Sequence, residues 1–156
     1  AYKGTAADGV VEKMVAMGRI GRKGGKGYYD YPADGKKQLW PGIAETFGHA
    51  DAQPSPEEVK TRLLYRQLVE CARCFEEGVL ETPQDGDLGA IFGWGFAPHT
   101  GGPFSHMDTV GLDKVVAELD RLAQAYGERF MPPKLLRDMA ARGETFYGRA
   151  VEKAAA

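Results

Sequence analysis

The chain has 156 residues, 43% hydrophobic and 27% charged, with a formal net charge of -2. This is an ordinary globular composition, and the length suffices for one packed core or two small ones. The slightly acidic balance argues against nucleic acid or an anionic membrane surface as the main partner, and no apolar run approaches the ~20 residues that span a bilayer.

The first third of the chain predicts a helix, a glycine-rich loop and a small ribbon. A helical pattern covers residues 5–17 and ends at Gly18. A loop rich in glycine and cations follows at residues 19–27. The expected apolar side of the helix consists of Val10, Val11, Met14, Val15 and Met17. Beyond the loop, residues 28–31 and 37–40 predict two short strands joined by a turn, and proline at position 41 begins a short helix to residue 47.

A polar segment with two prolines, residues 49–56, indicates the boundary between two units. Ser55 has the side chain of a good N-cap, and Pro56 suits the first turn of the long helix that follows. We expect this helix to end at Gly78. Its predicted buried face repeats at three- and four-residue spacing and comprises Leu64, Leu68, Cys71, Ala72 and Phe75.

The stretch of residues 87–111 predicts a helix, a glycine-proline elbow and a second helix. Glycine closes the first helix at Gly93-Trp94-Gly95, because it reaches left-handed backbone angles without a clash. Residues 96–98 should be extended, and Gly101-Gly102 turns the chain. Pro103 then fits the first turn of a short helix that ends at Gly111.

Two further helices are expected after the elbow. Residues 112–126 form a strongly amphipathic pattern, and residues 134–142 form a helix closed by Gly143. The apolar side of the former comprises Val115, Val116, Leu119, Leu122, Ala123 and Tyr126. The tail, residues 149–156, has little to bury, so we expect it to fray.

The glycine-rich loop invites a phosphate-binding interpretation, which its sequence does not support. Gly21 to Gly27 is one residue short of a P-loop, has glycine where Ser or Thr should hold magnesium, and follows no apolar strand. A weaker hypothesis is that Arg22, Lys23 and Lys26 contact an anion such as a CoA phosphate. A solvated basic loop is the favoured alternative.

The other candidate residues are two cysteines and three histidines. Cys71 and Cys74 have a redox or zinc spacing but lie inside a helix without a second ligand pair, so a structural role for Cys71 is favoured. The histidines are His49, His99 and His106; His99 could serve as an acid-base residue, with Asp108 orienting a neighbour. No nucleophile accompanies them, and surface or capping roles are favoured for His99 and His106.

A similar sequence pattern occurs near both ends of the chain. Residues 14–19, with Gly18, precede an aromatic pair at residues 28–29, and residues 139–144, with Gly143, precede a second pair at residues 146–147. Each copy contains the end of a helix, a glycine stop and two aromatic side chains. This pattern indicates a repeated closing element.

The elbow resembles the C-terminal helical domain of the 3-hydroxyacyl-CoA dehydrogenases. That pattern is Asp, Gly-x-Gly-[FY]-Pro, Gly-Pro-[FA] and Asp-x-x-Gly; it is matched here by Asp87, Gly93, Gly95, Phe96, Gly102, Pro103, Phe104, Asp108 and Gly111. The family's proline stands one place later, at Pro98. Residues 18–29 are similar to the family's closing motif, and the doubled glycine before Pro103 is most like the multifunctional fatty-acid oxidation subunits, which carry two copies of this domain.

The resemblance implies a mainly α fold, a helical bundle of the 6-phosphogluconate dehydrogenase C-terminal-like type, with a small β-ribbon near residues 27–40. It assigns residues 1–50 to the tail of a first helical repeat and residues 51–148 to a second. The family asparagine that lines the active site in the first repeat is replaced here by Thr61, beside Arg62, which we expect to be structural. No catalytic, cofactor-binding or metal-binding residue is therefore expected in this chain.

As implied by the resemblance, the parent would be an NAD-dependent (3S)-3-hydroxyacyl-CoA dehydrogenase of β-oxidation, and this piece alone would be inactive, with no NAD bound. Its expected partners are the first helical repeat and the NAD-binding domain of the parent chain, with a thiolase subunit as a further one, and acyl-CoA would reach it through the parent. The chain starts at Ala1, which suggests an excised piece. The compartment would be the cytoplasm in bacteria, or the mitochondrial matrix or peroxisome in eukaryotes, in line with two cysteines and no signal peptide. The alternative is a stand-alone helical interaction module without catalytic activity.

Overall fold

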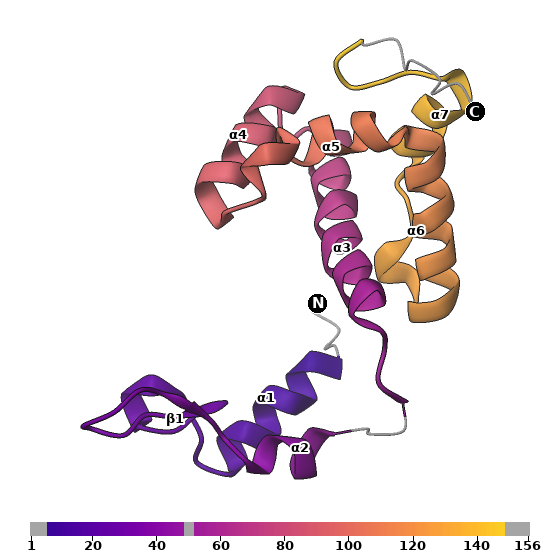
Figure 1. Cartoon of the computed structure of the whole chain (residues 1–156). Coiled ribbons are helices and arrows are strands. Elements are labelled where there is room, and N and C mark those ends of the chain that lie inside the picture. Colours follow the sequence, from indigo (N-terminus) through magenta and orange to yellow (C-terminus); the bar gives the residue numbers. More distant parts are fainter. Residues whose placement is uncertain (1–5, 49–51, 149–156) are drawn as a thin grey trace. The chain divides into compact units, whose positions relative to one another are not determined.

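The computed structural model describes residues 6–48 and 52–148 (Figure 1). The chain divides into two compact units, residues 1–53 and 54–156, and the division falls inside the segment expected to be a boundary. The assignment of the two units to two helical repeats stays a prediction. His49 and the tail that we expected to fray, residues 149–156, lie outside the described residues.

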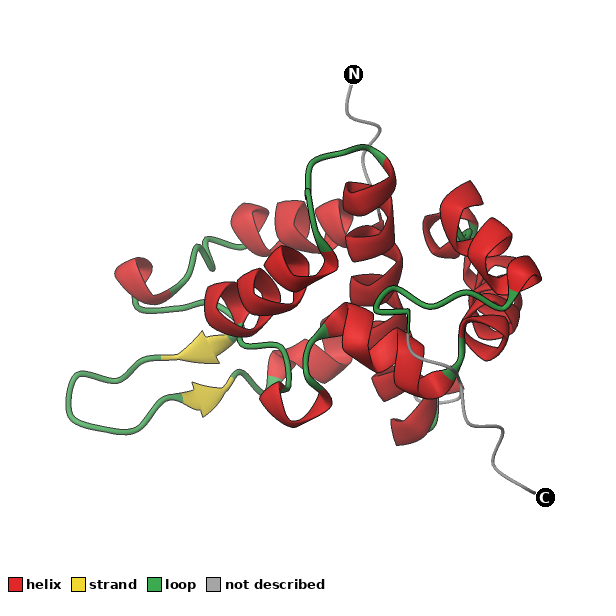
Figure 2. Cartoon of the chain, turned by 90° about the horizontal axis from the view of Figure 1, so that it is seen from above, coloured by secondary structure: helices red, strands yellow, loops and turns green. Residues whose placement is uncertain are grey.

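The first unit contains two helices and a two-stranded antiparallel ribbon, which Figure 2 shows as two short arrows side by side. Its elements are α1 (Ala6–Ala16), the 3-10 helix η1 (Arg22–Gly24), β1 (Tyr29–Asp30), β2 (Gln38–Leu39) and α2 (Gly42–Phe47). Tyr29 pairs with Leu39, and Asp30 pairs with Gln38. The ribbon expected near residues 27–40 is therefore confirmed.

The apolar side expected for the first helix is mostly uncovered. Met14 is 3% exposed, whereas Val11 and Val15 are 53% and 55% exposed. The periodicity identified the helix correctly, but most members of its apolar side are exposed within the described structure. The first unit has too few packed elements to cover both α1 and the ribbon, because a domain of this size buries only part of its apolar surface.

Arg19 ties the glycine-rich loop to the ribbon. Its Nε donates to the carbonyl of Gly27 at 2.8 Å, and its Nη2 pairs with Asp30 Oδ1 at 2.5 Å. The guanidinium also stacks over the Trp40 ring, 4.2 Å from the centroid. The side chain is only 10% exposed, so these contacts organise the first unit in place of a large core.

The second unit is all helical. Its elements are α3 (Pro56–Glu76), α4 (Pro83–Trp94), the 3-10 helix η3 (Pro98–Thr100), α5 (Pro103–Val110), α6 (Leu112–Tyr126), the 3-10 helix η4 (Glu128–Phe130) and α7 (Lys134–Arg142). Figure 1 shows α5 lying across the end of α3, with α4 on one side and α6 on the other. The mainly α fold predicted from the sequence is confirmed.

Local sequence explains where these helices begin and end. The hydroxyl of Ser55 accepts from the Glu58 N–H at 3.1 Å, as its predicted N-cap role requires, and Thr82 does the same for α4 through the Asp85 N–H. Gly95, with φ of +78°, closes α4 at the expected position. Pro98 differs from expectation, since it opens η3 instead of remaining extended.

The core of the second unit lies between α3, α5, α6 and α7. Its fully buried members include Leu68, Val69, Phe104, Met107, Val115, Leu119, Leu122, Phe130 and Leu136. The predicted apolar sides of α3 and α6 thus supply much of it. Phe75, Phe104 and Phe146 form an edge-to-face cluster with centroid distances of 4.8 to 5.9 Å, where each ring pair adds about 0.5–1.5 kcal/mol to the burial of its area.

Candidate functional site

Asp87 caps helix α5 from a neighbouring helix. The residue before α5 is a glycine, Gly102, which has no side chain to accept the free N–H groups of the first turn. Asp87, 3% exposed on α4, supplies the acceptor: Oδ1 accepts from the Phe104 N–H at 2.7 Å, and Oδ2 accepts from the Ser105 N–H at 3.1 Å and its hydroxyl at 2.7 Å. The negative carboxylate also suits the positive end of the α5 dipole. This elbow aspartate therefore has a structural role.

Gly102 permits that approach. Its φ is +109°, and a Cβ built at this position would lie 2.5 Å from the carboxyl atoms of Asp87. Any side chain would therefore strain the backbone and displace the capping carboxylate. The close packing of α4 against the start of α5 therefore requires glycine at position 102.

Asp108 holds the last described segment against the elbow. Its Oδ1 accepts from the Phe146 N–H at 2.9 Å, and its Oδ2 accepts from the Tyr147 N–H at 3.0 Å. The hydroxyl of Tyr147 in turn donates to Asp87 Oδ2 at 2.8 Å. Burial, and then the hydrogen bond to Asp87, raise the pKa of Tyr147 to about 12. In this structure Asp108 therefore accepts hydrogen bonds from two backbone N–H groups, and its expected role of orienting a neighbour stays a prediction.

The two described histidines lie at one pocket without forming an acid-base pair. His99 and His106 both line a pocket of about 370 Å³ beside the elbow. Burial lowers the pKa of His106, and the neighbouring His99 adds to this effect. In the described part of the chain, neither imidazole makes a hydrogen bond or ion pair with a carboxylate.

Cys71 and Cys74 behave as residues of helix α3. Cys71 is 6% exposed within the core cluster, and burial raises the pKa of its thiol to about 12. Cys74 is half-buried. Among the described residues, no group of three or more His, Cys, Asp or Glu side chains could hold a metal ion. The structural interpretation of Cys71 agrees with this placement.

The glycine-rich loop uses its backbone donors internally. The N–H groups of Gly21, Gly24, Gly25 and Gly27 donate to carbonyls of the same loop or of Tyr29, at 2.7 to 3.0 Å. These donors are what a phosphate cradle would need. Arg22, Lys23 and Lys26 are exposed, and of these three only Arg22 lines the pocket beside the ribbon. The loop does not gather its cations around one site.

The sequence echo has the same backbone geometry at both ends. Gly18 has φ of +68° and Gly143 has φ of +66°. The Arg19 N–H donates to the Met14 carbonyl at 2.9 Å, and the Glu144 N–H donates to the Met139 carbonyl at 2.9 Å. Each of these two bonds belongs to a Schellman motif, and in each the acceptor is the carbonyl of a buried methionine. The two units therefore close a helix in the same way.

An apolar surface covers the outer side of α4. Leu88 and Phe92, four residues apart on one face, are 55% and 83% exposed. Trp94 is 57% exposed and donates through its indole N–H to Gln67 of α3 at 3.1 Å, and Val79 is 69% exposed. A groove of about 410 Å³ between α3 and α4 is lined mainly by apolar groups, among them Val79 and Trp94. We call these four exposed side chains, which lie on α4 and on the loop before it, the α4 surface. Apolar side chains left exposed in one region are typical of an interaction site.

Comparison with known proteins assigns this fold. The family described as "3-hydroxyacyl-CoA dehydrogenase, C-terminal domain" matches residues 59–154. The chain belongs to this family. The resemblance inferred from the elbow residues is thereby confirmed, and the elbow contacts of Asp87, Gly102 and Asp108 show how the motif of a 3-hydroxyacyl-CoA dehydrogenase C-terminal domain builds its bundle.

Two relatives are named fatty acid oxidation complex subunit alpha. The protein of Shewanella amazonensis is 43% identical over 144 residues, and that of Shewanella loihica is 41% identical over 145 residues. Each match covers 90% of this chain and 20% of the relative, so the chain spans about a fifth of the length of the relatives it matches. As for membrane spans, none of the described helices combines the length and apolarity that a crossing requires.

The contacts of Tyr147 in this 3-hydroxyacyl-CoA dehydrogenase domain were not predicted from the sequence. The aromatic pair after Gly143 was noticed only as an echo, although Tyr147 links to both elbow aspartates. Arg62 stacks on Tyr126, 4.0 Å from the ring centroid, which agrees with its predicted structural role. Thr61 lies half-buried on α3.

Proposed function

We propose that this chain is the C-terminal part of an NAD-dependent (3S)-3-hydroxyacyl-CoA dehydrogenase of fatty-acid β-oxidation, in which it serves as a packing domain. Relatives named fatty acid oxidation complex subunit alpha, more than 40% identical over 90% of the chain, support the parent's identity. The parent's reaction would oxidise the 3-hydroxyl of the acyl-CoA by hydride transfer to NAD. A thiolase subunit is a further proposed partner of the parent.

We place catalysis and NAD outside this chain. Hydride transfer needs a dinucleotide site and a positioned general base. The glycine-rich loop of the first unit donates its backbone N–H groups internally, so it does not fit a pyrophosphate. His99 and His106 face one pocket without a carboxylate bonded to either among the described residues. These observations support a domain that does not turn over substrate alone.

The observation that carries the packing role is the α4 surface. Phe92 alone is 83% exposed, and burying such a side chain contributes about 2–3 kcal/mol. We propose that the first helical repeat of the parent chain covers this surface. The Schellman motif shared by residues 14–19 and 139–144 supports a second copy of the closing element in the same polypeptide.

The test uses the parent protein carrying Phe92→Glu in this domain. A charge in the covered surface should lower the thermal midpoint by several degrees and reduce NADH formation from (3S)-3-hydroxybutyryl-CoA, because the dehydrogenase loses a packed neighbour. The control is Gln124→Glu, which adds the same charge at an exposed position of α6 and should change neither quantity.

Two results would contradict the proposal. The 156-residue chain alone should form no NADH, so turnover by it would overturn the assignment of catalysis to the rest of the parent. If the parent with Phe92→Glu kept the wild-type thermal midpoint, the packing role would be contradicted, whereas the family assignment would be unaffected. The chain would then be better described as an interaction module for another protein.

A further inference from the structure

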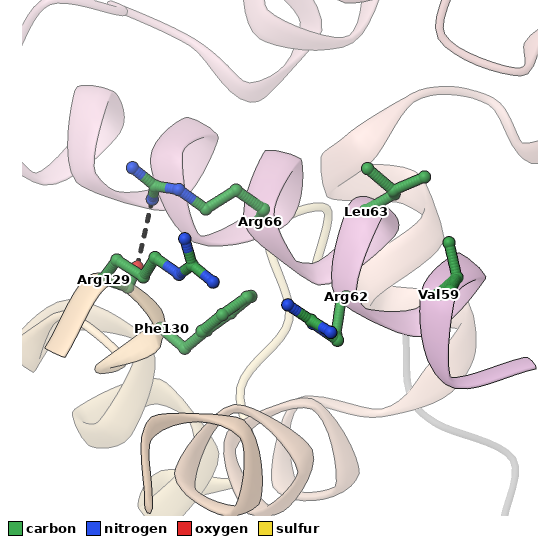
Figure 3. A pocket seen from close by; sticks show the side chains of 6 residues that line it. All are labelled: Val59, Arg62, Leu63, Arg66, Arg129 and Phe130. Carbon is green, nitrogen blue, oxygen red and sulfur yellow. Dashed lines mark hydrogen bonds between the residues drawn. The ribbon is translucent and has the colours of Figure 1, made fainter. Parts of the chain in front are cut away.

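A pocket rich in arginine lies between helix α3 and the 3-10 helix η4, and it belongs to none of the roles assigned above. Its volume is about 330 Å³, at the lower end of the range for small-molecule sites. It is lined by Val59, Arg62, Leu63, Arg66, Arg129 and Phe130. Figure 3 shows the ends of Arg62 and Arg129 beside the Phe130 side chain, with Arg66 above them.

Two of the three guanidinium groups have no carboxylate partner. Among the residues that the structure describes, Arg62 is engaged only by stacking on Tyr126, and Arg129 only over the ring of Phe130, 5.2 Å from its centroid. Arg66 alone pairs with an acid, Glu70. Two of the three guanidinium groups at the pocket therefore form no ion pair among the described residues, although Glu58 interacts with Arg62 at longer range.

Two acids on α3, Glu58 and Glu70, are each paired with an arginine other than Arg62 and Arg129. Glu58 pairs with Arg121 at 2.9 Å, and Arg121 is the main cause of the lowered pKa of Glu58, with Arg62 only a smaller Coulombic contributor. Glu70 is bonded to both Arg66 and Arg73. Arg62 and Arg129 consequently remain available for an external anion.

The wall of the pocket is held by hydrogen bonds from arginines to main-chain carbonyls, which do not neutralise the positive charge of the arginines. Arg66 Nη1 donates to the carbonyl of Arg129 at 3.0 Å, and Arg73 Nη2 donates to the carbonyl of Met131 at 2.9 Å. Phe130 is 2% exposed and anchors η4 in the core. The backbone that carries Arg129 is thus positioned by α3, so the site is built before a ligand arrives.

We propose that this pocket binds a phosphate monoester attached to a compact apolar or aromatic group. Guanidinium groups recognise oxyanions through paired N–H donors, and here they converge from two different elements. A phosphate offers three acceptor oxygens and up to two charges, whereas a carboxylate has two oxygens that one guanidinium can satisfy. Val59, Leu63 and the edge of Phe130 supply the apolar part of the lining.

The test is calorimetric titration of the 156-residue chain with phenyl phosphate, inorganic phosphate, phenol and phenylacetate. Phenyl phosphate should bind with a Kd in the range of about 0.1–1 mM, about tenfold tighter than inorganic phosphate, because the ring adds apolar contact. Phenol should give no heat of binding. Phenylacetate should bind at least about fivefold more weakly than phenyl phosphate.

The informative variants are Arg62→Gln and Arg129→Gln. Each should weaken phenyl phosphate binding about fivefold or more, and the double variant should abolish it. Arg129→Gln keeps the carbonyl that Arg66 contacts, so the fold of η4 should survive. The control Arg142→Gln removes the same charge from an exposed arginine paired with Glu144 and should leave the Kd unchanged.

Several outcomes would overturn this site. Equal binding by the wild type and the double variant, both with native circular dichroism, would place the anion elsewhere. Equal binding of inorganic phosphate and phenyl phosphate would remove the apolar part of the proposal. If phenylacetate bound as tightly as phenyl phosphate, the proposed phosphate ligand would be wrong. The ligand would then be a carboxylate, as on an acidic segment of a neighbouring protein.

Discussion

The hydroxyl of Tyr147 donates a hydrogen bond to Asp87 Oδ2 at 2.8 Å, joining residues 60 positions apart. The same carboxylate caps helix α5, while Asp108 on α5 receives the backbone N–H groups of Phe146 and Tyr147. The two aspartates and the tyrosine therefore form one closed network. It fastens the segment after α7 to the elbow between α4 and α5.

Removal of the Asp87 charge should destabilise the second unit. Asp87→Asn puts an amide where four donors converge: the Phe104 and Ser105 N–H groups and the hydroxyls of Ser105 and Tyr147. The amide nitrogen accepts no hydrogen bond, so buried donors are left without an acceptor. We expect a loss of about 2–4 kcal/mol in the free energy of unfolding, measured in urea. Asp138→Asn, which breaks an i,i+4 surface pair with Lys134, should change the free energy of unfolding far less, because solvent screens an exposed pair. Similar losses in both variants would refute the capping role.

Two glycine-to-alanine substitutions should change the free energy of unfolding in opposite directions. Gly102→Ala places a Cβ 2.5 Å from the Asp87 carboxyl at a φ of +109°, so it should destabilise by about 3 kcal/mol or more. Gly89→Ala lies inside α4 with nothing within 4 Å of the new Cβ, so it should stabilise by about 0.5–1 kcal/mol. Thermal unfolding of both variants distinguishes a steric requirement from general glycine flexibility. A neutral Gly102→Ala would contradict the close approach.

The contribution of Tyr147 should disappear at high pH. Its folded pKa, about 12, lies above its ordinary value of 10.0, so its stabilising effect is complete below pH 10 and is lost as the pH rises toward 12. At neutral pH, Tyr147→Phe should lower the free energy of unfolding by about 1 kcal/mol. The difference between wild type and variant, measured by urea unfolding from about pH 8 to 11, should narrow above pH 10. A constant difference across that range would argue against the bond to Asp87.

The two cysteines should differ in reactivity. Burial raises the pKa of the Cys71 thiol to about 12, so little thiolate exists at neutral pH, whereas Cys74 is half-buried. We expect iodoacetamide to modify Cys74 at least about tenfold faster in the native chain. Trypsin cleaves at Arg73 and separates the two cysteines into different peptides, so mass spectrometry can follow each. Equal rates in the native chain, as after unfolding, would show that Cys71 is not protected.

Local chemistry made much of the fold predictable. Ser55 with Pro56 marked the start of α3, Gly95 and Gly143 marked helix ends, and the periodicity of α6 identified a buried side. These features act within one or two helical turns, where side-chain capping and backbone freedom are set by neighbouring residues. The same local features do not say whether the apolar side of α1 is covered, because burial depends on which other elements are present to pack against it.

The candidate sites were less predictable. The sequence marked Arg22, Lys23 and Lys26 as cations of one loop, but the structure leaves them exposed and does not bring the three to one pocket. The arginine pocket instead joins Arg62 and Arg129, which are far apart in the sequence. No spacing rule connects such residues, since they meet only when η4 returns to α3.

By itself, the sequence determined the helices, their caps, the ribbon and the family to which the elbow motif belongs, because each depends on short-range geometry or on a contiguous pattern. Only the tertiary structure decided what the motif residues do. In the tertiary structure Asp87 and Asp108 belong to one hydrogen-bond network, and Phe92 and Trp94 are exposed. The physical reason is that hydrogen-bond partners and burial are set by the approach of distant segments, which no local pattern encodes.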